Sequence, residues 1–479
     1  MIRIRDLWDR KTRTHLALAL LAGLFLRLFF VIYVPFADID SDLYNELGRN
    51  VVKIHAYAYD SGNGMVATDA RVPGYPLFLG ALYVVGADSQ QAIFVAQAIV
   101  DLGTCVLIAI LAASLAPDPS RKRVAIAGMW LAATCPFVAN YAADGTTEVL
   151  ATFFSAAALL FLVWAQQSEF EPNAAERKRR SARHWLLAGA IIGLGSLVRP
   201  ETPIILLAPA IVLAAQWYKP VNRMRLARAG VLLGVGMLVP LVPWAARNWI
   251  TLHKVQFLTD RYFDLGDSYI PVGFYAWTHT WMYSYAQVDA VINKMDSEPL
   301  EITDFPGYAF DSPQERARVA TLLDAQHNDS LAFPPDADTE FAALARERTA
   351  RDPLRTYLTV PFRRAIALWF TPRTELLPYV GNWWPLRPQW RSSHEDFMVG
   401  VIFTVLNYFY AGLALAGAYM MRKRHGVALL VIFIFARTIF ISVEHITAEP
   451  RFVLPCVPAV LALGALVWAR RRHQETTAS

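Results

Sequence analysis

The chain has 479 residues, of which 55% are hydrophobic and only 18% are charged. A water-soluble protein of this length would carry more charge, so this composition excludes that class and indicates a protein that crosses a membrane several times. The formal net charge of +5 does not indicate a nucleic-acid partner. Its Lys and Arg residues are grouped in short runs between apolar segments, as in the cytoplasmic loops of membrane proteins.

Apolar runs that suit membrane-spanning helices recur along the whole chain. We predict about ten spans, at residues 15–36, 90–115, 123–140, 146–166, 184–199, 202–218, 229–247, 397–421, 427–443 and 452–469. Basic clusters such as 121–123 and 422–424 follow alternate spans, which places them and both termini on the cytoplasmic side. All basic clusters fall on the same side only if the apolar residues 72–87 lie at the outer surface and do not cross the membrane.

Two long segments then face outward. In the first, residues 37–89, the apolar side chains of Leu43, Leu47 and Val51 share one face of a predicted surface helix at 42–54. We expect Ser41 to cap this helix, which leaves Asp40 just before it.

The second outward segment, about 251–396, is long enough for a small subdomain. Within it, the stretch YLTVPFRRAIALWFTP at 357–372 suits a helix lying on the membrane surface. We therefore predict three regions: a membrane domain at 1–250, an extracytoplasmic subdomain at 251–396 and C-terminal membrane helices at 397–479.

Six short motifs follow one another on the predicted outward side. They are DSDLY at 40–44, RVPGYPLFLGALY at 71–83, DGTTEVL at 144–150, LVRPE at 197–201, PWAARNW at 243–249 and EPRFVLP at 449–455. Their order resembles that in the GT-C glycosyltransferases of family 39, which include protein O-mannosyltransferases and the aminoarabinose transferase of lipid A. The resemblance covers about residues 15–250 and 397–469. It implies an all-α, GT-C-like polytopic bundle with outward-facing interfacial helices and a smaller periplasmic subdomain.

The resemblance also implies an inverting hexosyl- or pentosyltransferase of the inner (plasma) membrane. Such an enzyme moves a sugar from a polyprenyl-phosphate donor to a hydroxyl of a glycolipid, glycan or protein on the outer side. One carboxylate is enough as general base, because the phosphate leaves as a stable anion and needs no general acid. Asp40 takes the place of the family's catalytic aspartate. The acid expected after it is Ser41 here, and Asp42 is out of frame, so Asp40 and Asp42 both remain candidates.

Arginines on the outward side are the candidates for binding the donor phosphate, because a guanidinium offers a planar fork of donors. By the resemblance, Arg71 takes the place of a phosphate-contacting cation. The topology puts Arg199, Arg247 and Arg451 on the same side. Further candidates for the wall of the cavity are Tyr44, Glu148, Glu201, His445 and Glu449. The structural alternatives are that Arg199 only pairs with Glu201 and that Glu148 only packs between helices.

Other classes of site and function remain as alternatives. No cofactor follows with certainty, and a divalent metal stays open because His445 lies near Glu449. Arg27 and Asp101 have similar depth in their spans, so we expect a structural ion pair. An O-antigen ligase or polymerase would carry its key residues in the second outward segment. A lipid or sugar transporter would carry charges near the midplane of the bilayer.

Overall fold

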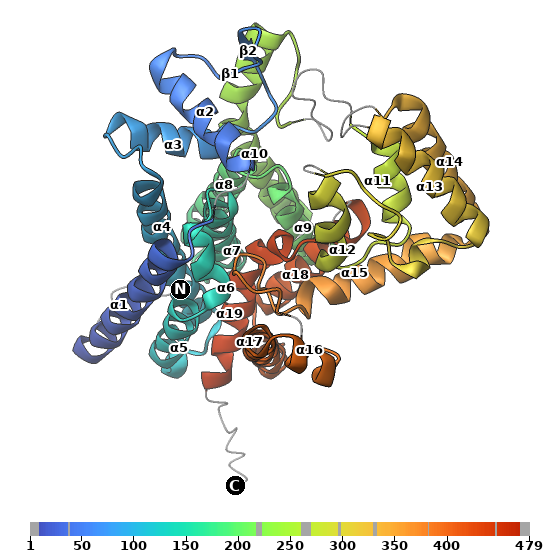
Figure 1. Cartoon of the computed structure of the whole chain (residues 1–479). Coiled ribbons are helices and arrows are strands. Elements are labelled where there is room, and N and C mark those ends of the chain that lie inside the picture. The colour runs from blue at the N-terminus through green and yellow to red at the C-terminus, as the bar shows by residue number, and fades with distance from the viewer. Residues whose placement is uncertain are drawn as a thin grey trace. The chain divides into compact units, whose positions relative to one another are not determined.

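The computed structural model describes residues 9–36, 39–216, 223–259, 270–295, 298–328, 333–381, 383–445 and 448–469, without the side chains of 39–40 and 325–328. Contacts divide the chain into two compact units. The membrane unit comprises residues 1–259, 372–436 and 454–479, and the insert unit comprises residues 260–371 and 437–453. The helices are coloured along the chain in Figure 1.

Within the described residues, seven helical stretches are long and apolar enough to cross a membrane. They are α1 (Arg10–Tyr33), α4 (Gln90–Leu115), α7 (Glu148–Ser168), α10 (Arg223–Leu252), α17 (His394–Met420), α18 (Val427–Glu444) and Pro450–Trp468. The last stretch contains η9 (Pro450–Cys456), α19 (Val457–Ala465) and η10 (Leu466–Trp468). An eighth is a pair bent by 54°, Asp118–Ala133 and Pro136–Ala143, if the pair counts as one span. The bent pair contains η2 (Asp118–Ser120), α5 (Arg121–Ala133), α6 (Pro136–Ala139) and η3 (Asn140–Ala143).

By length and composition, the described residues thus contain seven or eight candidate spans, compared with the ten predicted. Residues 184–199 fall mostly in α8 (Ala174–Ser196), whose first half is strongly basic. Of the predicted span 202–218, the described residues form η4 (Thr202–Leu206) and α9 (Leu207–Ala214), and residues 217 and 218 lie outside the described part of the chain. A helix over Thr202–Ala214 is about 20 Å long, which is shorter than the roughly 30 Å of hydrocarbon in a bilayer.

A buried ion pair joins the helices at the start of the membrane unit. Arg27 of α1 and Asp101 of α4 lie 2.7 Å apart, and both side chains are fully buried. The Arg27 guanidinium also donates to the carbonyl oxygens of Gly23 and Ala133, at 2.9 and 3.0 Å. The predicted structural ion pair is confirmed. The further bonds of Arg27 help to compensate for burying its charge, whereas the Oδ1 atom of Asp101 is buried without a hydrogen-bond partner.

The segment between α1 and α4 contains α2 (Ile39–Lys53), the antiparallel strands β1 (Ala58–Asp60) and β2 (Met65–Ala67), and α3 (Gly74–Val84). The apolar face of α2 packs as predicted, because Leu43, Leu47 and Val51 join one cluster with Tyr57 and with Trp244 of α10. Figure 1 shows α2 and α3 next to each other. With only 11 residues, about 16 Å of helix, α3 is too short to cross a bilayer, as expected for residues 72–87.

The start of α2 differs from the prediction. The helix begins at Ile39, so Ser41 is not its N-cap and Asp40 lies inside its first turn. Ser41 is buried, and a Cβ placed on Gly145 would lie 2.7 Å from its hydroxyl oxygen. Ser41, which the local sequence predicts to cap the helix, therefore makes a tertiary contact with Gly145 instead.

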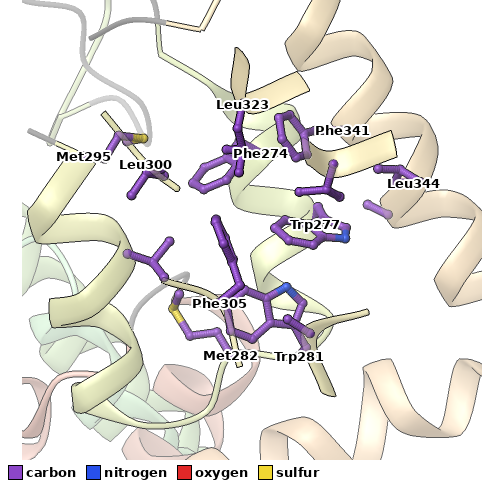
Figure 2. Packing of buried hydrophobic residues seen from close by; sticks show 14 of the residues in the cluster. Phe274, Trp277, Trp281, Met282, Met295, Leu300, Phe305, Leu323, Phe341 and Leu344 are labelled. Carbon is purple, nitrogen blue, oxygen red and sulfur yellow. The ribbon is translucent and has the colours of Figure 1, made fainter. Parts of the chain in front are cut away.

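The insert unit is helical. Its elements are α11 (Val272–His279), α12 (Tyr285–Gln287), η6 (Val288–Asn293), η7 (Gly307–Ala309), α13 (Pro313–Asn328), α14 (Pro335–Arg351), η8 (Arg355–Thr359) and α15 (Val360–Trp369). In the membrane unit, α16 (Leu386–Ser392) precedes α17. Figure 2 shows the core of the insert unit, where the ring of Phe341 lies 5.1 Å from that of Phe274 and 5.4 Å from that of Trp277. The Asp338 carboxylate accepts the backbone N–H groups of Gly273 and Phe274, which ties α14 to the start of α11.

A buried network of charges supports this core. Arg348 pairs with Glu315 at 2.5 Å and with Asp311 at 3.2 Å, and Arg355 pairs with Asp311 at 2.6 Å. Burial alone would raise the pKa of Asp311, but the hydrogen bond from Arg355 and the charges of Arg348 and Arg351 outweigh it and lower that pKa. Asp311 is therefore ionised at neutral pH and holds α14 and η8 together.

Candidate active site

Two of the motifs meet at a glycine. The backbone N–H of Gly74 donates to the carbonyl oxygen of Leu197 at 2.6 Å. A Cβ on residue 74 would lie 2.5 Å from that oxygen, so only glycine allows this approach. The turn before α3 therefore rests on the turn after α8, and the RVPGYP motif contacts the LVRPE motif.

Arg199 lies at the centre of a group of carboxylates. Its guanidinium is 2.6 Å from Glu148 and 3.3 Å from Glu201. The Thr146 hydroxyl contacts the carboxylates of both Glu148 and Asp144, and Asp144 and Glu148 are buried. The ion pair between Arg199 and Glu148 thus joins the LVRPE motif to the DGTTEVL motif. Because two carboxylates already balance its charge, Arg199 is better suited to position this loop than to hold a phosphate.

A chain of hydrogen bonds links α3 to the same loop. The Tyr75 hydroxyl donates to Gln97 of α4 at 2.8 Å, and the Gln97 amide donates to the carbonyl oxygens of Asp144 and Ala142 at 2.7 and 3.2 Å. The backbone N–H of Phe36 donates to the carbonyl of Ala143 at 2.8 Å. The chain leaving α1 is therefore held beside the DGTTEVL motif shortly before α2 begins.

Arg71 lies close to α2. Its guanidinium is 5.9 Å from the centre of the Tyr44 ring, a cation–π distance, and the Tyr44 ring is 5.1 Å from the ring of Tyr75. The hydroxyl of Tyr57 donates to the Arg71 carbonyl at 2.9 Å. Burial raises the pKa of Tyr57 well above 10, so Tyr57 stays neutral and acts here only as a donor. Tyr44 and Arg71, both predicted site residues, are brought together.

The two candidate bases differ in their position on α2. Asp40 is one helical turn before Tyr44, and its side chain lies outside the described part of the structure. Asp42 is exposed and lines a small cavity of about 180 Å³ with Asn45 and Arg49. Two residues along a helix correspond to a rotation of about 200°, so Asp42 and Tyr44 point away from each other. The four-residue spacing instead places Asp40 on the face of Tyr44.

Arg247 has a role that the sequence did not reveal. It donates to the carbonyl oxygens of Thr68 and Tyr57 at 2.7 and 2.6 Å, and it lies over the rings of Tyr57 and Trp244. It thereby fastens the loop that carries the two strands to α10. Arg247 also borders a mainly apolar cavity of about 640 Å³. Other residues that line this cavity are Val51, Leu77, Leu197, Pro240 and Pro243.

The remaining candidates belong to the insert unit and form a group of their own. Arg451 pairs with Glu449 at 2.5 Å, and the ring of His445 lies 4.4 Å from that of Phe452. These three candidates belong to the insert unit, whereas Arg71 and Arg199 belong to the membrane unit. Among the described residues, no three His, Cys, Asp or Glu side chains are grouped so that they could hold a metal ion.

Several polar residues of the site were not singled out from the sequence. Asp144 opens the DGTTEVL motif, and an acid next to Gly145 just before a span was a signal that could have identified it. Gln97 gives no such signal, because a lone amide within an apolar span fits helix packing as well. The Tyr141 hydroxyl donates to Glu375 at 2.9 Å, although 234 residues separate them. Only the fold brings Glu375 to this loop.

The fold can be compared with known structures. The oligosaccharyltransferase of Archaeoglobus fulgidus, tethered with an acceptor peptide containing the NVT sequon, matches with a TM-score of 0.52 and 14% identity, over 96% of this chain and 49% of that one. AglB of the same organism, in complex with an inhibitory peptide and a dolichol-phosphate, matches with a TM-score of 0.50 and 14% identity. That match covers 95% of this chain and 50% of AglB. This chain spans about half the length of those proteins. The fold is therefore that of the GT-C glycosyltransferases.

Within that class, residues 70–245 match the family model described as dolichyl-phosphate-mannose-protein mannosyltransferase. The matched region contains the RVPGYP, DGTTEVL and LVRPE motifs that meet in the structure. No curated protein matches the chain in sequence. The resemblance to the GT-C enzymes of family 39, predicted from the order of the motifs, is confirmed by the family match and the fold together.

Proposed function

We propose that the protein is an integral-membrane inverting glycosyltransferase that moves a sugar from a polyprenyl-phosphate donor to an acceptor hydroxyl on the outer side of the membrane. The observation that carries this proposal is the meeting of the RVPGYP, DGTTEVL and LVRPE motifs beside α2, with Arg71 over Tyr44. The family match supports a lipid-phosphate donor, as does the neighbour of similar fold that binds dolichol-phosphate.

In this proposal, Asp40 removes the proton from the acceptor hydroxyl as the hydroxyl oxygen attacks the anomeric carbon of the donor. The bond from that carbon to the phosphate oxygen breaks, and the phosphate leaves with the electron pair. Arg71 binds the phosphate and stabilises its growing charge. Arg199 positions the DGTTEVL loop through Glu148, and Arg247 positions the loop that carries Tyr57. The polyprenyl chain has an apolar surface available in the cavity beside α10.

Donor binding tests this proposal directly. Arg71→Met should weaken the binding of polyprenyl phosphate to the purified protein in nanodiscs by about 10- to 100-fold, since hydrogen bonds to a charged group contribute about 1.5–3 kcal/mol. Arg49→Met on the exposed side of α2 is the matched control and should bind as the wild type does. Equal binding by the wild type and Arg71→Met would remove the phosphate role of Arg71. Failure of the wild type to bind polyprenyl phosphate would contradict the proposed function.

Cysteine labelling tests the side of the membrane. Ser61 is exposed in the turn between β1 and β2, so Ser61→Cys should react with an impermeant maleimide added to whole cells. Ala175→Cys, at the exposed start of α8 in a predicted cytoplasmic loop, should react only after the cells are opened. The native Cys105, Cys135 and Cys456 are buried and should give little background. The reverse pattern would place the proposed site on the cytoplasmic side. Ser330, a second predicted outward position, lies outside the described residues.

A further inference from the structure

A groove of about 570 Å³ lies within the insert unit, between α11, α14, η8 and the end of α18. Its volume is in the range of small-molecule sites, roughly 300–1,000 Å³. Apolar and aromatic side chains make much of its wall, among them Ala276, Tyr275 and Tyr357. Two charged side chains of opposite sign also line it, Arg346 of α14 and Glu444 of α18. The groove therefore suits a ligand that combines apolar surface with both charges.

The end of α18 fixes the depth of this groove relative to a bilayer. The helix is a candidate membrane span of 18 residues. Its length of about 27 Å is close to the roughly 30 Å of hydrocarbon in a bilayer, so its last turn lies where hydrocarbon meets headgroups. Val443 and Glu444 are its last two residues, and both line the groove. Val443 and Ile439 share one face and are 42% and 61% exposed, so apolar surface that faces the membrane leads to the groove.

Hydrogen bonds hold the wall of the groove against this end of α18. Arg364 of α15 is fully buried and donates to the ring of His279 at 2.7 Å and to its carbonyl at 3.0 Å. It also donates to the carbonyl oxygen of Ser442 at 3.0 Å. The indole N–H of Trp369 donates to the Thr438 hydroxyl at 2.8 Å. The groove is therefore preorganised, which lowers the cost of ordering side chains when a ligand binds.

The helix next to the groove carries apolar side chains on its surface. Leu358 of η8 and Phe362 and Ile366 of α15 recur every four residues, and between 44% and 65% of each is exposed. Leu368, on the opposite face, is fully buried. An amphipathic helix with one exposed apolar face binds in the interfacial layer of lipids. The segment that lines the groove with Tyr357 is thus suited to contact lipid.

We propose that the groove binds a membrane phospholipid of the phosphatidylethanolamine type, which the protein holds without consuming it. The lipid phosphate pairs with Arg346, whose guanidinium offers a planar fork of donors. The ammonium group of the headgroup donates to the Glu444 carboxylate, which an alkylammonium matches in charge and hydrogen bonding. The acyl chains lie along Val443 and Ile439. This site goes beyond the proposed glycosyl transfer and does not depend on it.

Native mass spectrometry of the full-length protein in detergent tests the proposal. The protein receives equal amounts of phosphatidylethanolamine and phosphatidylglycerol with the same acyl chains, because only the first carries an ammonium group. The wild type should retain about fivefold more phosphatidylethanolamine, the upper end for a partly exposed ion pair. Glu444→Gln should remove this preference, and Arg346→Met should lower retention of both lipids by about fivefold. Arg316→Met, at an exposed arginine of α13 outside the groove, is the matched control and should behave as the wild type does.

A second variant tests the groove by filling it. Ala276 is exposed and lines the groove, so Ala276→Trp should lower lipid retention as strongly as Arg346→Met does, while the lipid-free protein unfolds at the same temperature as the wild type. Equal retention of the two lipids by the wild type would contradict the assignment of the headgroup. Normal retention in both Arg346→Met and Ala276→Trp would show that the groove is not the lipid site. Displacement of the lipid by an equal concentration of glycerophosphoethanolamine would mean that the ligand is a soluble phosphodiester and not a lipid.

Discussion

Asp40→Asn is expected to lower the rate of sugar transfer by about 10²–10⁴-fold, the usual effect of removing a general base. Asparagine keeps the size of the side chain but cannot take the proton from the acceptor hydroxyl. Because Asp40 lies in the first turn of α2, its charge also favours the positive end of the helix dipole. The substitution should therefore cost about 0.3–1 kcal/mol of helix stability as well. Only the loss of rate is large.

The two effects separate in a measurement of turnover, donor binding and thermal unfolding on the same preparation. Asp40→Asn should bind polyprenyl phosphate as the wild type does and unfold at a slightly lower temperature. Asp42→Asn is the matched control: Asp42 is exposed, faces away from Tyr44 and belongs to the same turn of α2. Normal turnover in Asp40→Asn with loss in Asp42→Asn would move the base to Asp42. Normal turnover in both variants would mean that neither carboxylate takes the proton.

The sequence was sufficient for elements that depend on local pattern. The apolar face of α2 could be predicted because Leu43, Leu47 and Val51 recur at helical spacing, and these residues do pack together. The Arg27–Asp101 pair could be predicted because a charge deep in a span needs a partner at the same depth. The start of α2 could not be predicted, because Ser41 is used in a contact with Gly145, about a hundred residues away. Capping rules hold only where tertiary contacts do not compete.

In the candidate site, too, some features could be predicted from the sequence and others depend on tertiary contacts. The resemblance and the topology made Arg71, Tyr44, Glu148 and Arg199 candidates, and in the structure Arg71 lies near Tyr44 while Arg199 pairs with Glu148. The resemblance and the topology could not show how each arginine uses its hydrogen-bond donors. Arg247 donates two hydrogen bonds to backbone carbonyls of the loop that it holds. The positive charge of an arginine in the sequence does not distinguish this structural role from phosphate binding. The contact of Tyr141 with Glu375 depends on the course of the whole chain.

Arg199→Met is expected to destabilise the protein by about 3–5 kcal/mol, the typical cost of leaving a buried charge without its partner. Glu148 is only 3% exposed and 2.6 Å from the guanidinium, so its carboxylate would lose its counterion while still excluded from water. Glu201 keeps 22% of its side chain exposed and can be hydrated. The loss should appear as a lower midpoint of unfolding for the full-length protein in detergent.

The double variant Arg199→Met/Glu148→Met decides what the pair does. Replacing both partners of a buried pair with apolar side chains of similar size is often neutral or stabilising, so much of the lost stability should return. Two carboxylates already balance the charge of Arg199, so we expect the refolded double variant to bind polyprenyl phosphate nearly as well as the wild type. If its stability returns but donor binding is lost, Arg199 contacts the phosphate directly. If Arg199→Met alone is as stable as the wild type, the Glu148 carboxylate finds enough water or other donors without Arg199, and the pair does not hold the DGTTEVL loop.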